Sequence, residues 1–263
     1  MYRVIRIGHA GAVETDGAAP SHGLDDRALT EVVALARSGD PALRVADLAD
    51  QVGYSPFHFS RLFTGRVGIG PGQYLTAVRI DRAKRLLLEG SAPVIDVATA
   101  VGFDSLSSFT RRFGAAVGIT PARFRQLADT VADHAPAPFR LTGEDPRSVE
   151  VMLDLPSDLV RHGDPAVWVG WYPHPAPIGL PRSGVLARSR EQVTLPLCTG
   201  APWLLGFAVP AQADVLDQLA PTHPVVAVHP SPVTSSCALT LHFGSARRGV
   251  VPLLSALPSL CRS

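Results

Sequence analysis

The 263-residue chain contains little cysteine and almost no lysine. Its three cysteines, Cys198, Cys237 and Cys261, are an odd number and form no CxxC pair, which argues against a disulfide framework or a zinc clip. Lys84 is the only lysine, so arginine carries nearly all of the positive charge. The planar guanidinium of arginine suits bidentate binding of phosphates and guanine edges better than the ammonium group of lysine does.

Long apolar runs are also missing. No run reaches the roughly 18 residues that a membrane-spanning helix needs. The start, MYRVIRIGHAGAVETDG, has too short an apolar stretch for a secretory signal. We therefore expect a cytoplasmic protein without a membrane partner. An apolar share of 46% and a charged share of 18% are typical of a folded chain, and the length predicts about two domains.

Acidic residues are scarce in one part of the chain. The overall net charge is only +1, but residues 55–125 contain ten Arg or Lys against four Asp or Glu. This local excess of positive charge favours a partner that carries negative charge.

The composition and the hydrophobic pattern of the sequence change along its length. Residues 1–23 contain YRVIRI, which fits one short strand, and then become a lead of Gly, Ala, His and Pro that predicts a flexible segment. Helical signals dominate residues 24–128, where apolar residues recur near a 3.6-residue period. Residues 129–147 have the composition of a linker.

Residues 148–263 have the signals of short strands. VEVMLDL and ALTLHF alternate with period two, and AVWVGWYP, WLLGFAVP and PVVAVHP are apolar runs closed by proline. One short helix fits QADVLDQLA. The predicted fold class is therefore multidomain, an all-α domain followed by an all-β sandwich or small barrel.

The helical part contains a repeat. VADLADQVGYSPFHFSRLF, residues 45–63, is echoed by VIDVATAVGFDSLSSFTRRF, residues 94–113, and about a dozen identities keep the same order through Pro71 and Pro121. Each copy predicts a helix, a turn at Gly53 or Gly102, and a second helix. Such a unit is a helix-turn-helix, whose second helix suits the major groove of DNA.

The residues between the copies predict one long helix, GQYLTAVRIDRAKRLLLEG. Fifteen to twenty helical residues span roughly 25–30 Å. Two adjacent major grooves on one face of a duplex are about 34 Å apart. One chain can therefore read two adjacent half-sites, and we expect it to bind DNA as a monomer or as a homodimer.

Residues 25–127, about 100 of 263, resemble the DNA-binding domain of the AraC/XylS family of bacterial transcription regulators. The second copy, DVATAVGFDSLSSFTRRFGAAVGITPARFR, follows the signature of that family through the following residues: Ala98, Gly102, Phe103, Ser107, Phe109, Arg111, Phe113, Gly118, Pro121 and Phe124. The resemblance implies a double helix-turn-helix fold over residues 24–128 and double-stranded DNA as the partner. It implies neither a cofactor nor a catalytic residue.

The same resemblance implies the residues that contact DNA. In the family, base contacts come from the start and outer face of each second helix. The corresponding positions here are Pro56, Phe57, Ser60, Arg61, Leu106, Ser107, Ser108 and Arg111, with Arg112 beside them. Capping remains an alternative for the serines, and packing remains one for Phe57. Candidate phosphate contacts, as a group, are Arg66, Arg79, Arg82, Lys84, Arg85, Arg112, Arg123 and Arg125.

This order of domains departs from the usual layout of the family, in which the DNA-binding domain lies at the C-terminus behind a sensor. Residues 148–263 are accordingly an expected effector or dimerisation domain, and RNA polymerase and a small-molecule effector remain open as partners. Trp168, Trp171, Tyr172 and Trp203 could line a ligand pocket there or form the core.

Other readings are weaker. GIGPGQY, residues 68–74, follows a helix and lacks the ending of a phosphate loop. The cysteines and His162, His174, His223, His229 and His242 show no tight metal-ligand spacing, so no metal is expected. Two rival functions stay open: a DNA-repair alkyltransferase that also regulates, although no Pro-Cys-His context is present, and a carbohydrate-binding sandwich with exposed aromatic residues.

Overall fold

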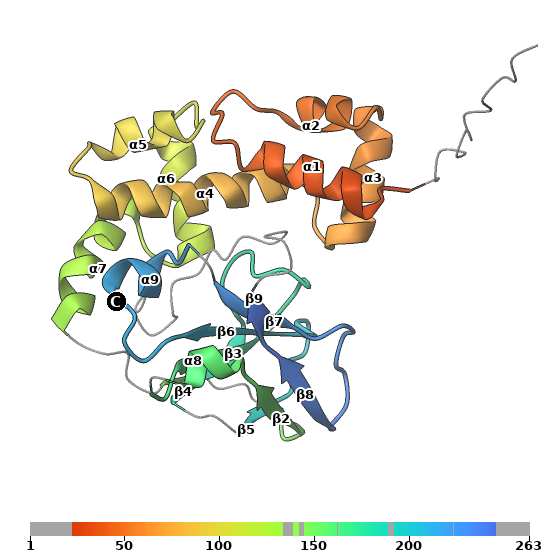
Figure 1. Cartoon of the computed structure of the whole chain (residues 1–263), viewed down its shortest axis with the longest axis vertical. Helices are drawn as coiled ribbons and strands as arrows, with labels where there is room; N and C mark the ends of the chain where they lie inside the picture. The colour runs from red at the N-terminus through yellow and green to blue at the C-terminus, as the bar shows by residue number, and fades with distance from the viewer. Residues whose placement is uncertain are drawn as a thin grey trace, which may run out of the picture.

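The computed structural model describes residues 23–133, 139–141, 145–161, 163–188, 192–222 and 224–245. The expected strand at YRVIRI lies outside these residues. Figure 1 shows helices α1 to α6 in the upper part of the molecule and the strands in the lower part. No helix of the described chain is long and apolar enough to cross a membrane.

The helical part contains two units with the same order of elements. Its helices are α1 Asp26–Ala36, α2 Val45–Gln51, α3 Pro56–Val67, α4 Pro71–Glu89, α5 Val94–Ala100, α6 Leu106–Val117 and α7 Pro121–Asp133. The pair α2–α3 is the first helix-turn-helix and α5–α6 is the second. Helix α7 continues past residue 128, where the sequence predicts the linker to begin; that domain boundary stays a prediction.

The same local signals begin and end both second helices. Ser55 and Ser105 are N-caps whose hydroxyls accept hydrogen bonds from the backbone N–H groups of His58 and Ser108. At the C-terminal ends, Gly68 and Gly118 adopt left-handed φ values of 81° and 97°, which glycine tolerates best. The serine before each helix and the glycine after it can be recognised in the sequence. The prediction of two helix-turn-helix units is therefore confirmed.

Helix α4 connects the two units as a 19-residue rod. At 1.5 Å per residue it is about 28 Å long. Its buried side chains serve both units: Tyr74 and Leu75 lie in the core with α1–α3, whereas Ile80 and Leu87 lie in the core with α5–α7. The rod therefore belongs to both cores and holds the units apart.

The second part is β-rich, as predicted, and has two sheets. One sheet has the order β1-β4-β3-β6-β7-β9 and the other has the order β5-β2-β8. The strands are β1 Phe139–Leu141, β2 Ser148–Asp154, β3 Ala166–Tyr172, β4 Ser183–Arg188, β5 Gln192–Pro196, β6 Trp203–Val209, β7 Val225–Val228, β8 Ala238–His242 and β9 Gly244–Ser245. Two short helices, α8 Ser157–Val160 and α9 Val215–Leu219, complete it.

The two sheets pack face to face around one core, which makes the domain a sandwich. Val149 and Val151 of β2 meet Val169 and Trp171 of β3 in this core. The pairing is antiparallel except between β2 and β8, which run parallel. The expected short helix at QADVLDQLA is confirmed as α9.

Helix α9 joins the sandwich to the helical part. It packs against α4 and α7, and its Leu219 is fully buried in the core of the second helix-turn-helix unit. The side chain of Arg85 in α4 also donates to the carbonyl oxygen of Pro221 at 3.2 Å. The two parts of the chain therefore share buried apolar surface.

Candidate nucleic-acid interface

Matching aromatic ladders fix the second helix of each unit. In the first unit the rings of Phe59 and Phe63 are 5.4 Å apart, and those of Phe63 and Tyr74 are 5.3 Å apart. In the second unit, Phe109 and Phe113 are separated by 5.6 Å, and Phe113 and Phe124 by 5.5 Å. Because the same faces of α3 and α6 are buried, the same opposite faces point outward.

The outward face of α3 carries the first set of predicted contact residues. Pro56, Phe57 and Arg61 are exposed and Ser60 is half-buried. The side chain of Phe57 is 83% exposed, so it is not part of the core. Packing in the core therefore does not account for Phe57, and its contact with DNA stays a prediction.

The outward face of α6 repeats this arrangement. Leu106, Ser107, Arg111 and Arg112 are exposed, and Ser108 is half-buried. Arg111 occupies the position on α6 that Arg61 occupies on α3. The structure thus gathers the nine predicted residues on two exposed helix faces, while their contact with DNA stays a prediction.

The serines of the two faces are not the caps. Ser55 and Ser105 cap the helices, whereas the hydroxyl of Ser60 donates to the carbonyl oxygen of Pro56 at 2.7 Å. Ser107 lies with its hydroxyl 3.4 Å from that of Ser105. Capping therefore does not account for Ser60 or Ser107.

Most of the further phosphate candidates have structural roles instead. Arg79 donates to the carbonyl oxygens of Pro41 and Leu43 at 3.0 and 2.8 Å, and its burial lowers its pKa from the ordinary value. Arg125 donates to the carbonyl oxygens of Leu87 and Ala92 at 3.1 and 2.6 Å.

Among the remaining phosphate candidates, some are buried or paired within the protein and others are exposed. Lys84 is fully buried, so its prediction as a phosphate contact is wrong. Arg82 donates to the carbonyl oxygen of Gly39, Arg66 pairs with Asp26, and Arg85 pairs with Asp81 at 3.2 Å. Arg112 and Arg123 remain exposed.

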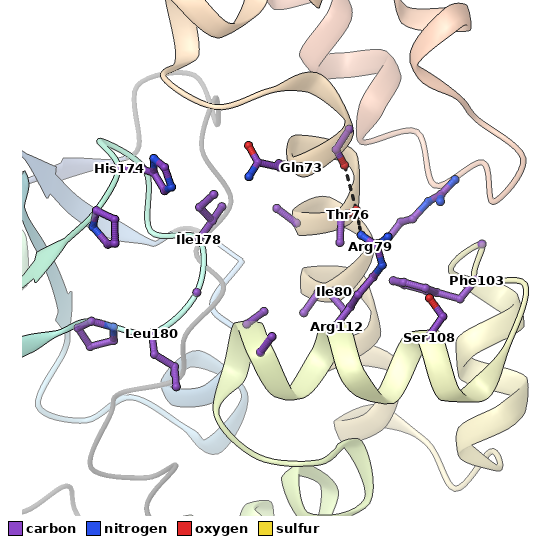
Figure 2. Close-up of a pocket in the computed structure, with 18 of the residues that line it drawn as sticks. Gln73, Thr76, Arg79, Ile80, Phe103, Ser108, Arg112, His174, Ile178 and Leu180 are labelled. Atoms are coloured by element: carbon purple, nitrogen blue, oxygen red, sulfur yellow. Dashed lines mark hydrogen bonds between the residues drawn. The ribbon is translucent and has the colours of Figure 1, made fainter. Parts of the chain in front are cut away.

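A groove lies between α4, the second helix-turn-helix unit and the second domain. It has a volume of about 1170 Å³ and is lined by α4, by the turn before α6, by α6 itself and by residues 173, 174 and 178–182 of the second domain. Figure 2 shows Gln73 and Thr76 on α4, Arg112 close to Thr76, Ser108 beside Phe103, and His174, Ile178 and Leu180 on the facing loop. Arg112 donates to the hydroxyl of Thr76 at 3.4 Å.

The sequence analysis named Ser108 and Arg112 as contact residues and Arg79 as a phosphate candidate, but it did not predict that a groove brings them together with Gln73, Thr76 and Arg182. Gln73 and Thr76 follow the repeat directly, and their outward position on a helix that begins at Pro71 is the signal that could have found them. His174 and Arg182 carried no such signal, because they come from a segment about 60 residues beyond α6.

The aromatic residues of the second domain lie mainly in its cores. Trp171 is fully buried between the two sheets, and its indole N–H donates to the carbonyl oxygen of Pro196 at 2.7 Å. Trp168 and Tyr172 are also buried, whereas Trp203 is half-buried. Trp168 and Trp171 belong to different core clusters, which does not favour one shared pocket; their role in ligand binding remains untested.

The possible metal ligands do not gather. The described residues contain no group of three or more His, Cys, Asp or Glu that could hold a metal ion. His242 lies 2.6 Å from the carboxylate of Asp154, and His229 lies 2.7 Å from the carbonyl oxygen of Ser231. His162, His223 and Cys261 lie outside the described residues.

Comparisons with known proteins concern the helical part. Residues 48–127 match a family model described as a helix-turn-helix domain. The chain is 36% identical over 85 residues to the HTH-type transcriptional regulator Rv1931c of Mycobacterium tuberculosis, a match over 32% of this chain and 33% of the relative. It is 40% identical over 88 residues to the HTH-type transcriptional activator AarP of Providencia stuartii, over 34% of this chain and 64% of the relative.

A solved structure is also similar. It is a transcriptional regulator from Chromobacterium violaceum, described as an AraC-type DNA-binding domain-containing protein, with 32% identity, a TM-score of 0.36 and coverage of 38% of this chain and 90% of that chain. The chain spans less than two thirds of the length of either curated relative.

Proposed function

We propose that the chain is a sequence-specific DNA-binding regulator of transcription, because residues 48–127 match a helix-turn-helix family model and contain two helix-turn-helix units. In this proposal α3 and α6 enter successive major grooves, and Arg61 and Arg111 contact base edges at equivalent places in the two half-sites. Chromosomal DNA as the partner agrees with the cytoplasmic location that the sequence predicts.

One observation carries the proposal: two helices with the same buried face expose arginines at equivalent positions, one on each side of a 19-residue helix. The guanidinium of arginine binds O6 and N7 of guanine in a bidentate way, the commonest specific contact in the major groove. A rod of about 28 Å supports reading of neighbouring grooves by a single chain.

Selection of binding sites from random duplex DNA with the full chain tests the proposal. We expect an enriched site with two half-sites about 10 base pairs apart, bound by one chain per duplex in sedimentation experiments. A double variant, Arg61→Ala with Arg111→Ala, serves as the control and should enrich no sequence. Absence of enrichment by the unchanged chain would refute the proposal.

For the second domain we propose a role in regulating this activity, through an effector or through dimerisation. The shared cores at α9 and at residues 173–182 support this role, because a change in the sandwich reaches the helical part through them. Sedimentation of the full chain with and without DNA separates the monomer from the homodimer. A contact with RNA polymerase remains open.

The rival functions find less support. A carbohydrate platform needs exposed aromatic residues, whereas Trp168, Trp171 and Tyr172 are buried. An alkyltransferase needs an activated cysteine; Cys237 is exposed and Cys198 is half-buried, both without a Pro-Cys-His context. Mass spectrometry of the chain after incubation with alkylated DNA would detect transfer of an alkyl group to either cysteine.

A further inference from the structure

A segment of the second domain reaches both helix-turn-helix units. This interdomain segment, residues 173–182 between β3 and β4, has the sequence PHPAPIGLPR. The ring of Pro175 lies against Gly68 at the end of α3, so close that a Cβ on this glycine would be 2.3 Å from Pro175 Cγ. At the other end, Gly179 lies against the backbone of Ala115 in α6.

Apolar burial holds the interdomain segment in this place. Ala176 is fully buried in the core of the first unit. Ile178 packs against the cores of both units. The segment is therefore fixed to α3 and to α6 at once, and it forms one wall of the groove along α4 (Figure 2).

The reading faces are the exposed faces of α3 and α6 that carry the predicted contact residues. The groove borders the reading face of α6, because Ser108 and Arg112 line the groove and directly follow the exposed residues Ser107 and Arg111 of the same face. One residue corresponds to a rotation of about 100° around the helix. A duplex held on the reading faces of α3 and α6 therefore passes the mouth of the groove.

The part of the duplex at that mouth is its backbone. Two successive major grooves on one face are separated by the minor groove and the phosphates on either side of it. If α3 and α6 occupy the major grooves, these phosphates face α4, which connects the helices. The groove is thus placed against phosphates and not against base edges.

The charges of the groove match phosphates. The described residues that line it include three arginines, Arg79, Arg112 and Arg182, against one carboxylate, that of Asp104. The guanidinium of Arg79 is bound to two carbonyl oxygens, whereas Arg112, Arg182 and His174 are exposed. Two of these three exposed side chains come from the interdomain segment.

We propose that the interdomain segment is part of the DNA interface and that Arg182, together with His174 of the same segment, contacts backbone phosphates between the two half-sites. This inference rests on the proposed function of α3 and α6 and extends it to the second domain. The contact adds affinity and fixes the position of the chain on the duplex, but it carries no sequence information.

The test is DNA binding by the full chain with the substitution Arg182→Ala, measured by fluorescence anisotropy over a range of salt concentrations. We expect affinity to fall by about the same factor, 3- to 30-fold, on the selected site and on an unrelated duplex. The slope of log K against log salt should become shallower by about 0.9, as expected for one lost phosphate contact. The substitution Arg182→Lys should restore the slope, because it keeps the charge.

Arg140→Ala is the matched control, since Arg140 is an exposed arginine of the same domain that does not line the groove. It should change neither affinity nor slope. The main chain at Arg182 is held by its own N–H, which donates to the carbonyl oxygen of Trp171 at 2.8 Å, so the alanine variant should keep the segment in place. An unchanged melting temperature checks this.

Other outcomes overturn the inference. An Arg182→Ala variant with unchanged affinity and slope would remove the interdomain segment from the interface, including the case in which the groove holds a small anionic ligand instead. A loss confined to the selected sequence would also contradict a phosphate role. Failure of the proposed function appears differently, because the unchanged chain would then select no site at all.

Discussion

Arg61 and Arg111 hold equivalent positions on α3 and α6, and both are exposed. We expect Arg111→Ala to weaken binding to the selected site by about 1–3 kcal/mol and to relax the preference at one base step. Arg61→Ala should do the same at the corresponding step of the other half-site. Competition binding with a panel of single-base variants measures both effects.

The pattern of losses separates two roles of these arginines. A base contact affects the preferred sequence and leaves the affinity for unrelated DNA nearly unchanged, whereas a phosphate contact lowers affinity for all sequences alike. Equal losses on every duplex would leave Arg61 and Arg111 only as phosphate contacts. Arg161→Ala, a change of an exposed arginine in the second domain, is the control for a general loss of positive charge.

Tyr74 differs from its counterpart in the repeat by one hydroxyl. It is fully buried in the first unit, whereas Phe124 packs at the equivalent place in the second. The hydroxyl of Tyr74 is buried and makes no hydrogen bond within the part of the chain that the structure describes; burial raises its pKa, which the nearby Arg37 lowers in part. A buried unsatisfied polar group is destabilising.

Tyr74→Phe should therefore raise the free energy of unfolding by about 1 kcal/mol. Chemical denaturation followed by circular dichroism measures this change. The Phe124→Tyr substitution is the reciprocal control, and it should destabilise the second unit. A loss of stability in the Tyr74→Phe variant would indicate that the hydroxyl is bound in solution, for which the nearby Arg37 is the candidate partner.

At this scale the sequence predicts caps and faces but not the roles of the arginines. Ser55, Gly68 and the spacing of Phe59 and Phe63 are local signals, so the orientation of α3 follows from them. Whether an arginine faces DNA depends on residues far along the chain. The carbonyl oxygens that bind Arg79 and Arg125 belong to residues more than 30 positions away. No local sequence pattern predicts these hydrogen bonds.

At the scale of elements, the turns of the two helix-turn-helix units look alike but have different surroundings. Gly53 and Gly102 have positive φ values of 71° and 86°. A Cβ on Gly53 would meet open space, whereas a Cβ on Gly102 would lie 2.2 Å from the carbonyl oxygen of Pro41. The loop that contains Pro41 is held by Arg79 and Arg82 of α4, so it cannot easily withdraw.

We therefore expect Gly53→Ala to cost about 1 kcal/mol of stability, from the left-handed backbone alone. Gly102→Ala should cost about 3 kcal/mol or more, because backbone strain and overpacking add. Thermal unfolding of the two variants in parallel measures the difference. Equal costs would show that the loop at Pro41 moves away freely and does not join the two units.

The packing of the interdomain segment on the helices could not be predicted from the sequence. Its sequence, PHPAPIGLPR, has neither helical nor strand periodicity, and its prolines and glycine indicate only a loop. The burial of Ala176 and Ile178 depends on the surfaces of α3 and α6, which exist only in the folded chain. A loop that packs on another domain thus has no local signal, although it forms a wall of the groove.

At the scale of the whole molecule, the sequence predicts a helical part and a β-rich part but not how the two parts are joined. Alternating patterns indicate the strands, but the parallel pairing of β2 with β8 joins segments about 90 residues apart. No local sequence pattern predicts the docking of α9 on the helical part either. Since Leu219 and Ala176 are both fully buried in helical cores, the two parts should unfold together.

Leu219→Ala tests this coupling. It removes a fully buried side chain from the contact of α9 with the second helix-turn-helix unit, which should cost about 2–5 kcal/mol. The three tryptophans, Trp168, Trp171 and Trp203, all lie in the β-rich part, so fluorescence reports the sandwich. Far-ultraviolet circular dichroism at 222 nm reports mainly the helices.

In the unchanged chain the two signals should follow one denaturation curve, since a shared core makes unfolding cooperative. In the Leu219→Ala variant the curves should separate, because the contact that joins the parts is weakened more than either core. Leu180→Ala, a change at a leucine that is 46% exposed, should leave the curves coincident. Separate curves in the unchanged chain would mean that the sandwich and the helix-turn-helix units fold independently, and that changes in one are not transmitted to the other through α9.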